Sequence, residues 1–331
     1  MTDAADPVRA ALRAADRADA LGAWIVRRPP DAVLSEADEA RARSAPLAAT
    51  TLAVKDNVDV AGMATTAAHP AYSRVATSTA PAVAHLLDAG AVVVGKTNMD
   101  QFATGLVGTR SPYGPVCNPH RPDRIAGGSS SGSAVAVATG AADIGITTDT
   151  AGSGRVPAAL CGIVGLKPTR GLLSTRGVIP AIAGVDCVGI VARSVTTAAA
   201  AFGVAAVYDA DDPWSRRPPL GTPTVGQGPL RIGVPRPPEP SDLDGPAATA
   251  WAEQLDALAR IGTLVEVDVA PYLDAGALLY GGALVAARWN SFGEFLTAHP
   301  AGADPIVTAI VSAGRDLPAR RLAADGERLQ A

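Results

Sequence analysis

The chain has 331 residues, a formal net charge of −4, three cysteines and four histidines. A slightly acidic chain with its arginines spread along its length lacks the basic surface that nucleic acid requires, and no uninterrupted apolar run reaches the roughly 18 to 20 residues that span a bilayer. Three cysteines without C-x-x-C spacing argue against a disulfide framework and a zinc site. We therefore expect a cytoplasmic protein that binds neither nucleic acid nor membrane.

The first predicted element is an amphipathic helix over residues 5–20, because Val8, Leu12 and Ala15 recur at helical spacing among charged residues. A loop rich in Pro, Ser and Ala follows it. From about residue 51, short apolar strands alternate with helices: strands at 51–54, 91–94 and 143–146, and helices at 80–89, 98–104, 131–140 and 155–161. This alternation predicts an α/β fold with helices on both faces of a central sheet.

The second half continues this pattern with a strand at 230–234, a helix at 244–261 and a strand at 263–269, so no domain boundary is expected there. Helices dominate from residue 272 onward. We expect one domain over 1–331, with a helical segment to about residue 45 and a helical region over about 270–331. A charged helix over 318–331 without a following strand suggests that the chain stops before the domain closes.

Two stretches rich in Gly and Ser, 127–132 and 149–155, bring hydroxyls and free backbone amides together. Their glycines allow close approaches that a Cβ would block, and a helix beginning after Ser153 adds positive potential where an oxyanion could develop. This layout is typical of a nucleophile site. A phosphate cradle is an alternative, although neither common phosphate-binding glycine motif is present. A pair of structural turns that contain serine is another.

Lysine is scarce, because only Lys55, Lys96 and Lys167 occur among 28 basic residues. Arginine keeps its proton in proteins, whereas a buried lysine can lose it and act as a base. Lys55 follows a short buried strand, which makes it the favoured base. The alternative is that three lysines remain by chance and each pairs with a carboxylate.

Four motifs in this order resemble the amidase signature family. They are the stretches 54–57 (VKDN), 127–133 (GGSSSGS), 148–157 (TDTAGSGRVP) and 161–169 (CGIVGLKPT). The resemblance spans about residues 50–200, the expected signature core, and implies an amidase signature fold with a mixed, twisted central sheet.

The resemblance also implies roles for individual residues. Ser153 would be the nucleophile, Lys55 the general base, and Ser129 a bridging serine placed by a cis peptide after Gly128. The backbone amides of Thr150, Ala151, Gly152 and Ser153 would form the oxyanion hole, while Ser130 and Thr150 would orient the proton relay. Such a site requires no metal and no organic cofactor.

Residues 98–114 are similar in particular to allophanate hydrolases of this family. That resemblance implies that Tyr280 and Arg288, eight positions apart on one predicted helix, hold a substrate carboxylate. Eight helical residues advance about 12 Å and turn roughly 80° past two full turns, so both side chains can reach one ligand. The alternative places Tyr280 in the core and makes Arg288 a solvated charge.

The implied reaction converts allophanate (urea-1-carboxylate) to ammonia and N-carboxycarbamate, which later loses CO2, and the family also implies a homodimer. The segment 160–163 looks more like the broader family. Other activities therefore stay open: an aliphatic or malonamide-type amidase, a protein like the amidase component of Glu-tRNA(Gln) amidotransferase, or an inactive, truncated amidase-fold protein. Members usually continue past residue 331, so we expect a domain that is incomplete at its C-terminus.

Overall fold

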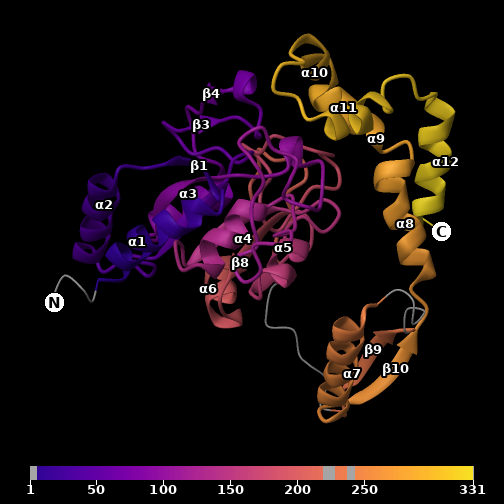
Figure 1. Cartoon of the computed structure of the whole chain (residues 1–331), viewed down its shortest axis with the longest axis horizontal. Coiled ribbons are helices and arrows are strands. Elements are labelled where there is room, and N and C mark those ends of the chain that lie inside the picture. The colour runs from indigo at the N-terminus through magenta and orange to yellow at the C-terminus, as the bar shows by residue number, and fades with distance from the viewer. Residues whose placement is uncertain (1–5, 219–227, 237–242, 331) are drawn as a thin grey trace.

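The computed structural model describes residues 6–218, 228–236 and 243–330. Its centre is a six-stranded mixed sheet (Figure 1). The strand order is β1 (Trp24–Arg27), β5 (Val92–Thr97), β2 (Thr51–Lys55), β6 (Ile144–Thr148), β8 (Val188–Ala192) and β7 (Val164–Leu166). The three strands β5, β2 and β6 are parallel, whereas β1 and β8 run antiparallel to their neighbours. The parallel strands are buried along their whole length, as expected for a sheet covered on both faces.

Two hydrophobic cores lie on opposite faces of this sheet. Successive side chains of a strand point to opposite faces, so Leu52 and Val54 belong to one core and Ala53 to the other. The core around Ala53 is closed by α1 (Pro7–Ala20), α2 (Pro30–Ala42), α4 (Ser131–Ala138) and α5 (Arg155–Leu160). The core around Leu52 and Val54 is closed by α3 (Pro81–Asp88) and α6 (Val195–Ala205). The predicted α/β fold with helices on both faces is confirmed.

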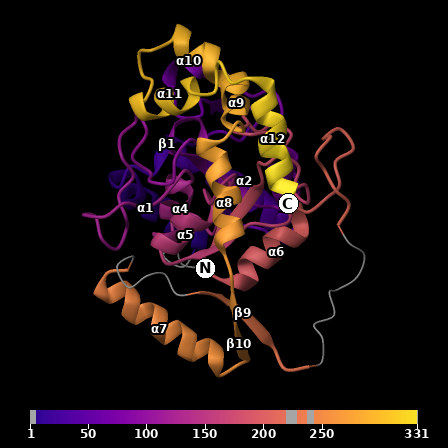
Figure 2. The ribbon, with the colours of Figure 1, turned by 90° about the vertical axis from the view of Figure 1, so that its right-hand side faces the viewer.

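A small unit follows the central sheet in the chain. It consists of β9 (Arg231–Pro235), α7 (Gly245–Ala259) and β10 (Thr263–Val267), with β9 and β10 paired in parallel. Figures 1 and 2 both show it beside the main body. The strand, helix and strand predicted at 230–234, 244–261 and 263–269 are confirmed, but within the described ranges β9 and β10 pair only with each other and not with the central sheet. Both strands are partly exposed along their length, unlike the buried strands of the central sheet.

The C-terminal region is helical, as predicted. Its elements are α8 (Ala270–Gly281), α9 (Val285–Arg288), the π-helix η4 (Trp289–Gly293), α10 (Glu294–Ala298), α11 (Pro305–Ser312) and α12 (Ala319–Gln330). Figure 2 shows α8 running from the β9–β10 pair towards α9. Phe292 of η4 stacks on Phe102 with ring centroids 4.4 Å apart, so this region packs directly on the segment that follows β5.

Two local predictions are wrong. Residues 98–104 form only the single 3-10 turn η3 (Gln101–Ala103), because Phe102 and Ala103 have φ values of 49° and 52°, which a right-handed helix excludes. Residues 30–42 form α2 rather than a loop, and their buried Val33, Ala37 and Ala40 do show helical spacing. The remaining short elements are β3 (Ala64–Thr65), β4 (Arg74–Val75) and η2 (Pro70–Tyr72). Within the described residues, no helix combines the length and apolarity that crossing a bilayer requires.

Candidate active site

The sheet topology brings the predicted motifs together at one edge. Lys55 is the last residue of β2, and β6 ends beside it at Thr148, because the two strands are parallel neighbours. Ser129 lies just before α4, whereas Ser153 lies in the turn between β6 and α5. The Gly128–Ser129 peptide bond is cis. The carboxyl end of the parallel sheet therefore collects an amine and two serine hydroxyls from three separate segments.

The side chain of Lys55 is fully buried and bonded to neutral oxygens. Its Nζ donates to Ser129 Oγ at 2.8 Å, to Thr148 Oγ1 at 2.7 Å and to the Thr148 carbonyl at 3.3 Å. Burial lowers the pKa of Lys55 to about 7, against the opposing effect of more distant carboxylates such as Asp100 and Asp149. A lysine with this pKa supplies neutral amine near neutral pH, which a general base requires.

The other two lysines differ from Lys55. The buried Lys96 places its Nζ 3.5 Å from Asp56 Oδ1 in an ion pair, and the exposed Lys167 donates to the carbonyl of Pro168. Lys55 has no carboxylate within ion-pair distance among the residues that the structure describes. The interpretation in which every lysine simply pairs with a carboxylate therefore holds for Lys96 alone.

Asp100 explains why glycine precedes Ser129. Its buried carboxylate accepts the backbone amides of Val107, Gly108 and Arg110, and a Cβ on Gly128 would collide with the Asp100 Oδ2. The Asp100 amide in turn donates to the Ser129 carbonyl at 3.1 Å. Gly128 thus allows the backbone before Ser129 to lie directly against a carboxylate.

Ser153 lies beside this pair without being hydrogen-bonded to Ser129. The Ser130 amide donates to the Ser153 carbonyl at 3.0 Å, which joins the two serine segments through their backbones. The Ser153 Oγ makes only a long contact of 3.5 Å with the Gly105 carbonyl. The structure therefore brings together Lys55 and Ser129, with the predicted nucleophile adjacent and its hydroxyl turned towards Gly105.

The turn that contains Ser153 is organised by Asp149. This buried carboxylate accepts hydrogen bonds from the backbone amides of Gly152, Gly154 and Arg155 and from the Arg155 guanidinium. Burial alone would raise the pKa of Asp149, but the charge and hydrogen bonds of Arg155 keep it low. The Gly152 amide, one of the predicted oxyanion donors, is therefore already bonded to Asp149 Oδ1 at 2.7 Å. The amides of Thr150, Ala151 and Ser153 form no hydrogen bond within the described chain and remain as donors.

The two residues predicted to support the relay make different contacts. Ser130 Oγ donates to the Thr148 carbonyl at 3.2 Å, the same oxygen that Lys55 contacts. Thr150 does not reach the relay, because its hydroxyl donates to Asp186 Oδ1 at 2.5 Å. Thr148 contacts the Lys55 amine instead, and it was not singled out because a threonine ending a buried strand gives no sequence signal of its own.

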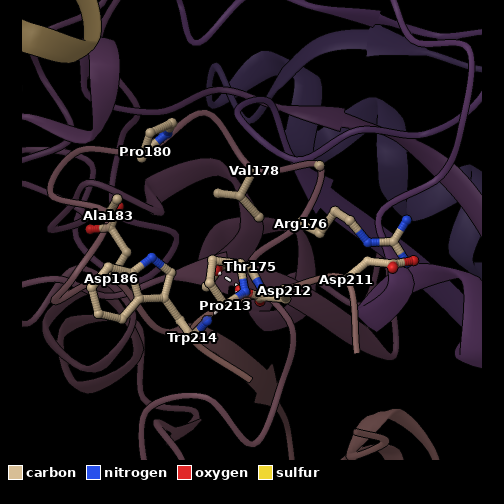
Figure 3. A pocket seen from close by; sticks show the side chains of 11 residues that line it. Thr175, Arg176, Val178, Pro180, Ala183, Asp186, Asp211, Asp212, Pro213 and Trp214 are labelled. Carbon is tan, nitrogen blue, oxygen red and sulfur yellow. Dashed lines mark hydrogen bonds between the residues drawn. The ribbon is translucent and has the colours of Figure 1, made fainter. Parts of the chain in front are cut away.

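Asp186 connects this turn to a cavity of about 280 Å³ (Figure 3). The cavity is lined by Thr175, Arg176, Gly177, Val178, Pro180, Ala183, Asp186, Asp211, Asp212, Pro213 and Trp214. Besides Thr150, the Asp186 carboxylate accepts the amides of Ala181 and Ile182. One side chain therefore both lines the cavity and fixes the residue at the start of the amide turn.

Tyr280 and Arg288 come together, although not on one helix. The consecutive glycines 281 and 282 end α8, and the extended backbone of Gly282 separates it from α9, so the single-helix prediction is wrong. The Arg288 Cζ nevertheless lies 5.1 Å from the centroid of the Tyr280 ring. Arg288 is fully buried rather than solvated, and burial lowers the pKa of its guanidinium.

The guanidinium of Arg288 is only partly satisfied. Its Nη1 donates to Thr104 Oγ1 at 2.8 Å, while its Nε and Nη2 and the Tyr280 hydroxyl have no partner within the described residues. Nε and Nη2 form one edge of the guanidinium. Arg155 uses that same edge to hold Asp149, with both distances at 2.9 Å. A buried cation with this edge free is suited to a planar anion such as a carboxylate.

Comparison with known proteins assigns the chain to a family. The model of the Amidase family matches residues 6–322. The chain therefore belongs to the amidase family. The structural neighbours are enzymes of the amidase signature fold, which agrees with the mixed sheet described above.

Relatives of this chain within the family are named for different enzymes. The urea amidolyase of Lachancea kluyveri is 42% identical over 280 residues, covering 82% of this chain and 15% of that protein. The indoleacetamide hydrolase of Pseudomonas syringae pv. syringae is 39% identical over 256 residues, covering 76% of this chain and 55% of that protein. The structure of Kluyveromyces lactis allophanate hydrolase superposes with a TM-score of 0.89 at 35% identity, covering 98% of this chain and 55% of that chain. The chain thus spans a minor part of the urea amidolyase and about half of the other two.

Proposed function

We propose that the protein hydrolyses allophanate to ammonia and N-carboxycarbamate with Ser153 as nucleophile, Ser129 as bridging serine and Lys55 as general base. The observation that supports this reaction best is the 2.8 Å hydrogen bond between the buried Lys55 amine and Ser129 Oγ. A buried amine with a pKa of about 7 can accept a proton that a charged surface lysine cannot.

In the proposed mechanism, substrate binding turns the Ser153 hydroxyl from the Gly105 carbonyl to Ser129. Neutral Lys55 then takes the Ser129 proton while Ser129 takes the proton of Ser153, and the Ser153 oxygen attacks the terminal amide carbonyl. The developing oxyanion accepts hydrogen bonds from the amides of Thr150, Ala151 and Ser153. The relay returns the proton to the departing nitrogen, ammonia leaves, and water hydrolyses the acyl-enzyme.

Arg288 and Tyr280 supply the proposed specificity. The free Nε and Nη2 edge of Arg288 would receive the carboxylate of allophanate, and the unpartnered Tyr280 hydroxyl would donate to the same group. The names of the urea amidolyase and allophanate hydrolase relatives support this choice of amide. An uncharged amide would leave the buried guanidinium unpaired and should bind more weakly.

Two variants test the proposal in an assay of ammonia release from allophanate. Ser153→Ala should reduce turnover by at least about a thousandfold, since the nucleophile is lost. Arg288→Ala should raise KM for allophanate far more than KM for biuret, its uncharged amide analogue. Normal turnover by Ser153→Ala would contradict the reaction, and equal effects of Arg288→Ala on both substrates would contradict the carboxylate role.

A second amidase activity has support from relatives named as components of Glu-tRNA(Gln) amidotransferase, one of which, from Natronomonas pharaonis, is 43% identical over 197 residues. If the protein served such an amidotransferase, ammonia release would depend on aminoacyl-tRNA and on a second protein chain. Glutamine hydrolysis measured with and without these components distinguishes this activity from allophanate hydrolysis. A fluorophosphonate probe addresses the inactive alternative, because only an activated Ser153 should be labelled.

We further propose that residues 1–331 act as one amidase domain, with a homodimer in the cytoplasm as the working form. The packing of Phe292 on Phe102 supports a single unit, because it joins the C-terminal helices to the signature core. Light scattering after size-exclusion chromatography measures the mass directly. A monomer at the concentration of the activity assay would contradict the dimer.

A further inference from the structure

We propose that Thr104 is a positioning residue that sets which edge of the Arg288 guanidinium faces the substrate. This inference rests on the proposed function, because it concerns how the carboxylate-binding arginine is held. Thr104 accepts the 2.8 Å hydrogen bond from Arg288 Nη1, and both side chains are buried. It comes from the segment after β5, whereas Arg288 comes from α9, which lies 184 positions later in the chain.

The geometry of the contact determines what remains free. With Nη1 bonded to Thr104, the unpartnered atoms are Nε and Nη2, which share one edge of the planar group. In Arg155 the same edge donates two hydrogen bonds to the carboxylate of Asp149, and in Arg176 it donates two to the carboxylate of Asp209. Without Thr104, the guanidinium could rotate and spread its donors among other acceptors. The hydrogen bond to Thr104 therefore leaves both Nε and Nη2 of Arg288 free to bind a carboxylate.

Thr104 is itself held in place. Its hydroxyl donates to the Phe102 carbonyl at 3.1 Å while accepting from Arg288, so both of its hydrogen-bonding roles are used. Arg110 Nη1 donates to the Thr104 carbonyl at 3.2 Å, and Phe102 stacks on Phe292. These contacts fix the segment against both the signature core and the C-terminal helices.

The same segment also reaches the nucleophile. Gly105, the next residue, places its carbonyl 3.5 Å from Ser153 Oγ. Consecutive Cα atoms are about 3.8 Å apart, so one short piece of backbone contacts the nucleophile and the carboxylate-binding arginine. We infer that the 104–105 segment fixes the distance between the reacting carbonyl and the substrate carboxylate. The substrate class that this favours is a short amide with a terminal carboxylate.

The decisive variant is Thr104→Val, which keeps the shape and removes the acceptor. KM for allophanate should rise about tenfold, since a hydrogen bond to a charged group is lost, and kcat should change far less. Thr104→Ser, which retains the hydroxyl, should restore most of the affinity. Thr139→Val is the matched control, because it removes a buried hydroxyl that bonds only within the helical turn at the end of α4. Melting temperatures show whether each variant is folded.

Calorimetric titration with malonate, a dicarboxylate without a hydrolysable amide, gives a second readout. Weaker malonate binding by Thr104→Val but not by Thr104→Ser supports the inference. If Arg288→Ala abolishes malonate binding and Thr104→Val binds normally, the inference fails while the proposed function stands. If wild-type protein neither hydrolyses allophanate nor binds malonate, both fail. Equal losses of kcat/KM for allophanate and biuret in Thr104→Val would also overturn the positioning role.

Discussion

Thr148 Oγ1 accepts a hydrogen bond of 2.7 Å from Lys55 Nζ, which makes this threonine as close to the amine as Ser129 is. Thr148 ends β6, and Lys55 ends the neighbouring parallel strand β2. The contact is therefore a direct result of strand register. It places an oxygen acceptor where it stabilises the protonated form of the lysine.

Thr148→Val should move the acidic limb of the pH–rate profile to lower pH. A hydrogen bond to the charged form of a group favours that form, so its loss lowers the pKa of Lys55 below its value of about 7. The expected displacement is about one pH unit, the size of one hydrogen bond to a charged group. The measurement is kcat/KM for allophanate as a function of pH, with Thr148→Ser as the control. An unmoved or raised limb in Thr148→Val would contradict this role.

The titration of Lys55 should govern both activity and stability. In the wild type, kcat/KM should rise with pH through about 7, because only the neutral amine is a base. Lys55→Met should abolish turnover, and so should Lys55→Arg, whose guanidinium remains charged. Lys167→Met, a change of an exposed lysine, should leave the profile unaltered.

The sign of the stability effect follows from the same pKa. The folded-state pKa of Lys55, about 7, lies below its ordinary value of 10.5, so between these values the unfolded chain holds a proton that the folded protein lacks. The free energy of unfolding should therefore rise with pH across this window, and the penalty of the buried charge is fully present below pH 7. In denaturant unfolding, the free energy of unfolding of Lys55→Met should exceed that of the wild type by the largest amount below pH 7. A gain that is independent of pH would contradict the shifted pKa.

Tyr280→Phe should separate substrate binding from stability. The Tyr280 hydroxyl is buried without a partner among the described residues, so its removal should leave the melting temperature unchanged or slightly higher. KM for allophanate should increase roughly tenfold because the substrate carboxylate loses one donor. Thermal unfolding and steady-state kinetics on the same preparation measure both effects. A large loss of stability with an unaltered KM would make Tyr280 a structural residue.

The sequence predicted the local elements of the fold well, and it named three residues that the structure gathers at the end of the parallel strands. Lys55, Ser129 and Ser153 each occur within a short motif, and the strands and helices that position them have clear apolar patterns. The covering helices α1, α3, α4 and α5 were placed within a few residues of their observed bounds. These features depend on residues that are close to one another in the sequence, so a local pattern is enough to predict them.

The missed features depend on distant partners. Thr148 and Asp100 were not singled out because their importance comes from Lys55 and from the backbone around Ser129. The separate sheet formed by β9 and β10 was not foreseen, because a strand pattern does not specify which sheet a strand joins. The break at Gly282 was also missed, since both sides of it are helical. Long-range geometry, rather than composition, determined each of these outcomes.

The turn built on Asp149 has a consequence for how such a protein can change over time. One carboxylate holds the backbone that presents both the proposed nucleophile Ser153 and the amides proposed as oxyanion donors, so a change at Asp149 would disturb both together. Arg288 lies far along the chain in α9, and it is connected to Ser153 through Thr104 and Gly105. Under the proposed function, a change in the choice of amide would therefore involve the C-terminal helices together with residues 104–105, whereas the turn held by Asp149 would have to keep its form.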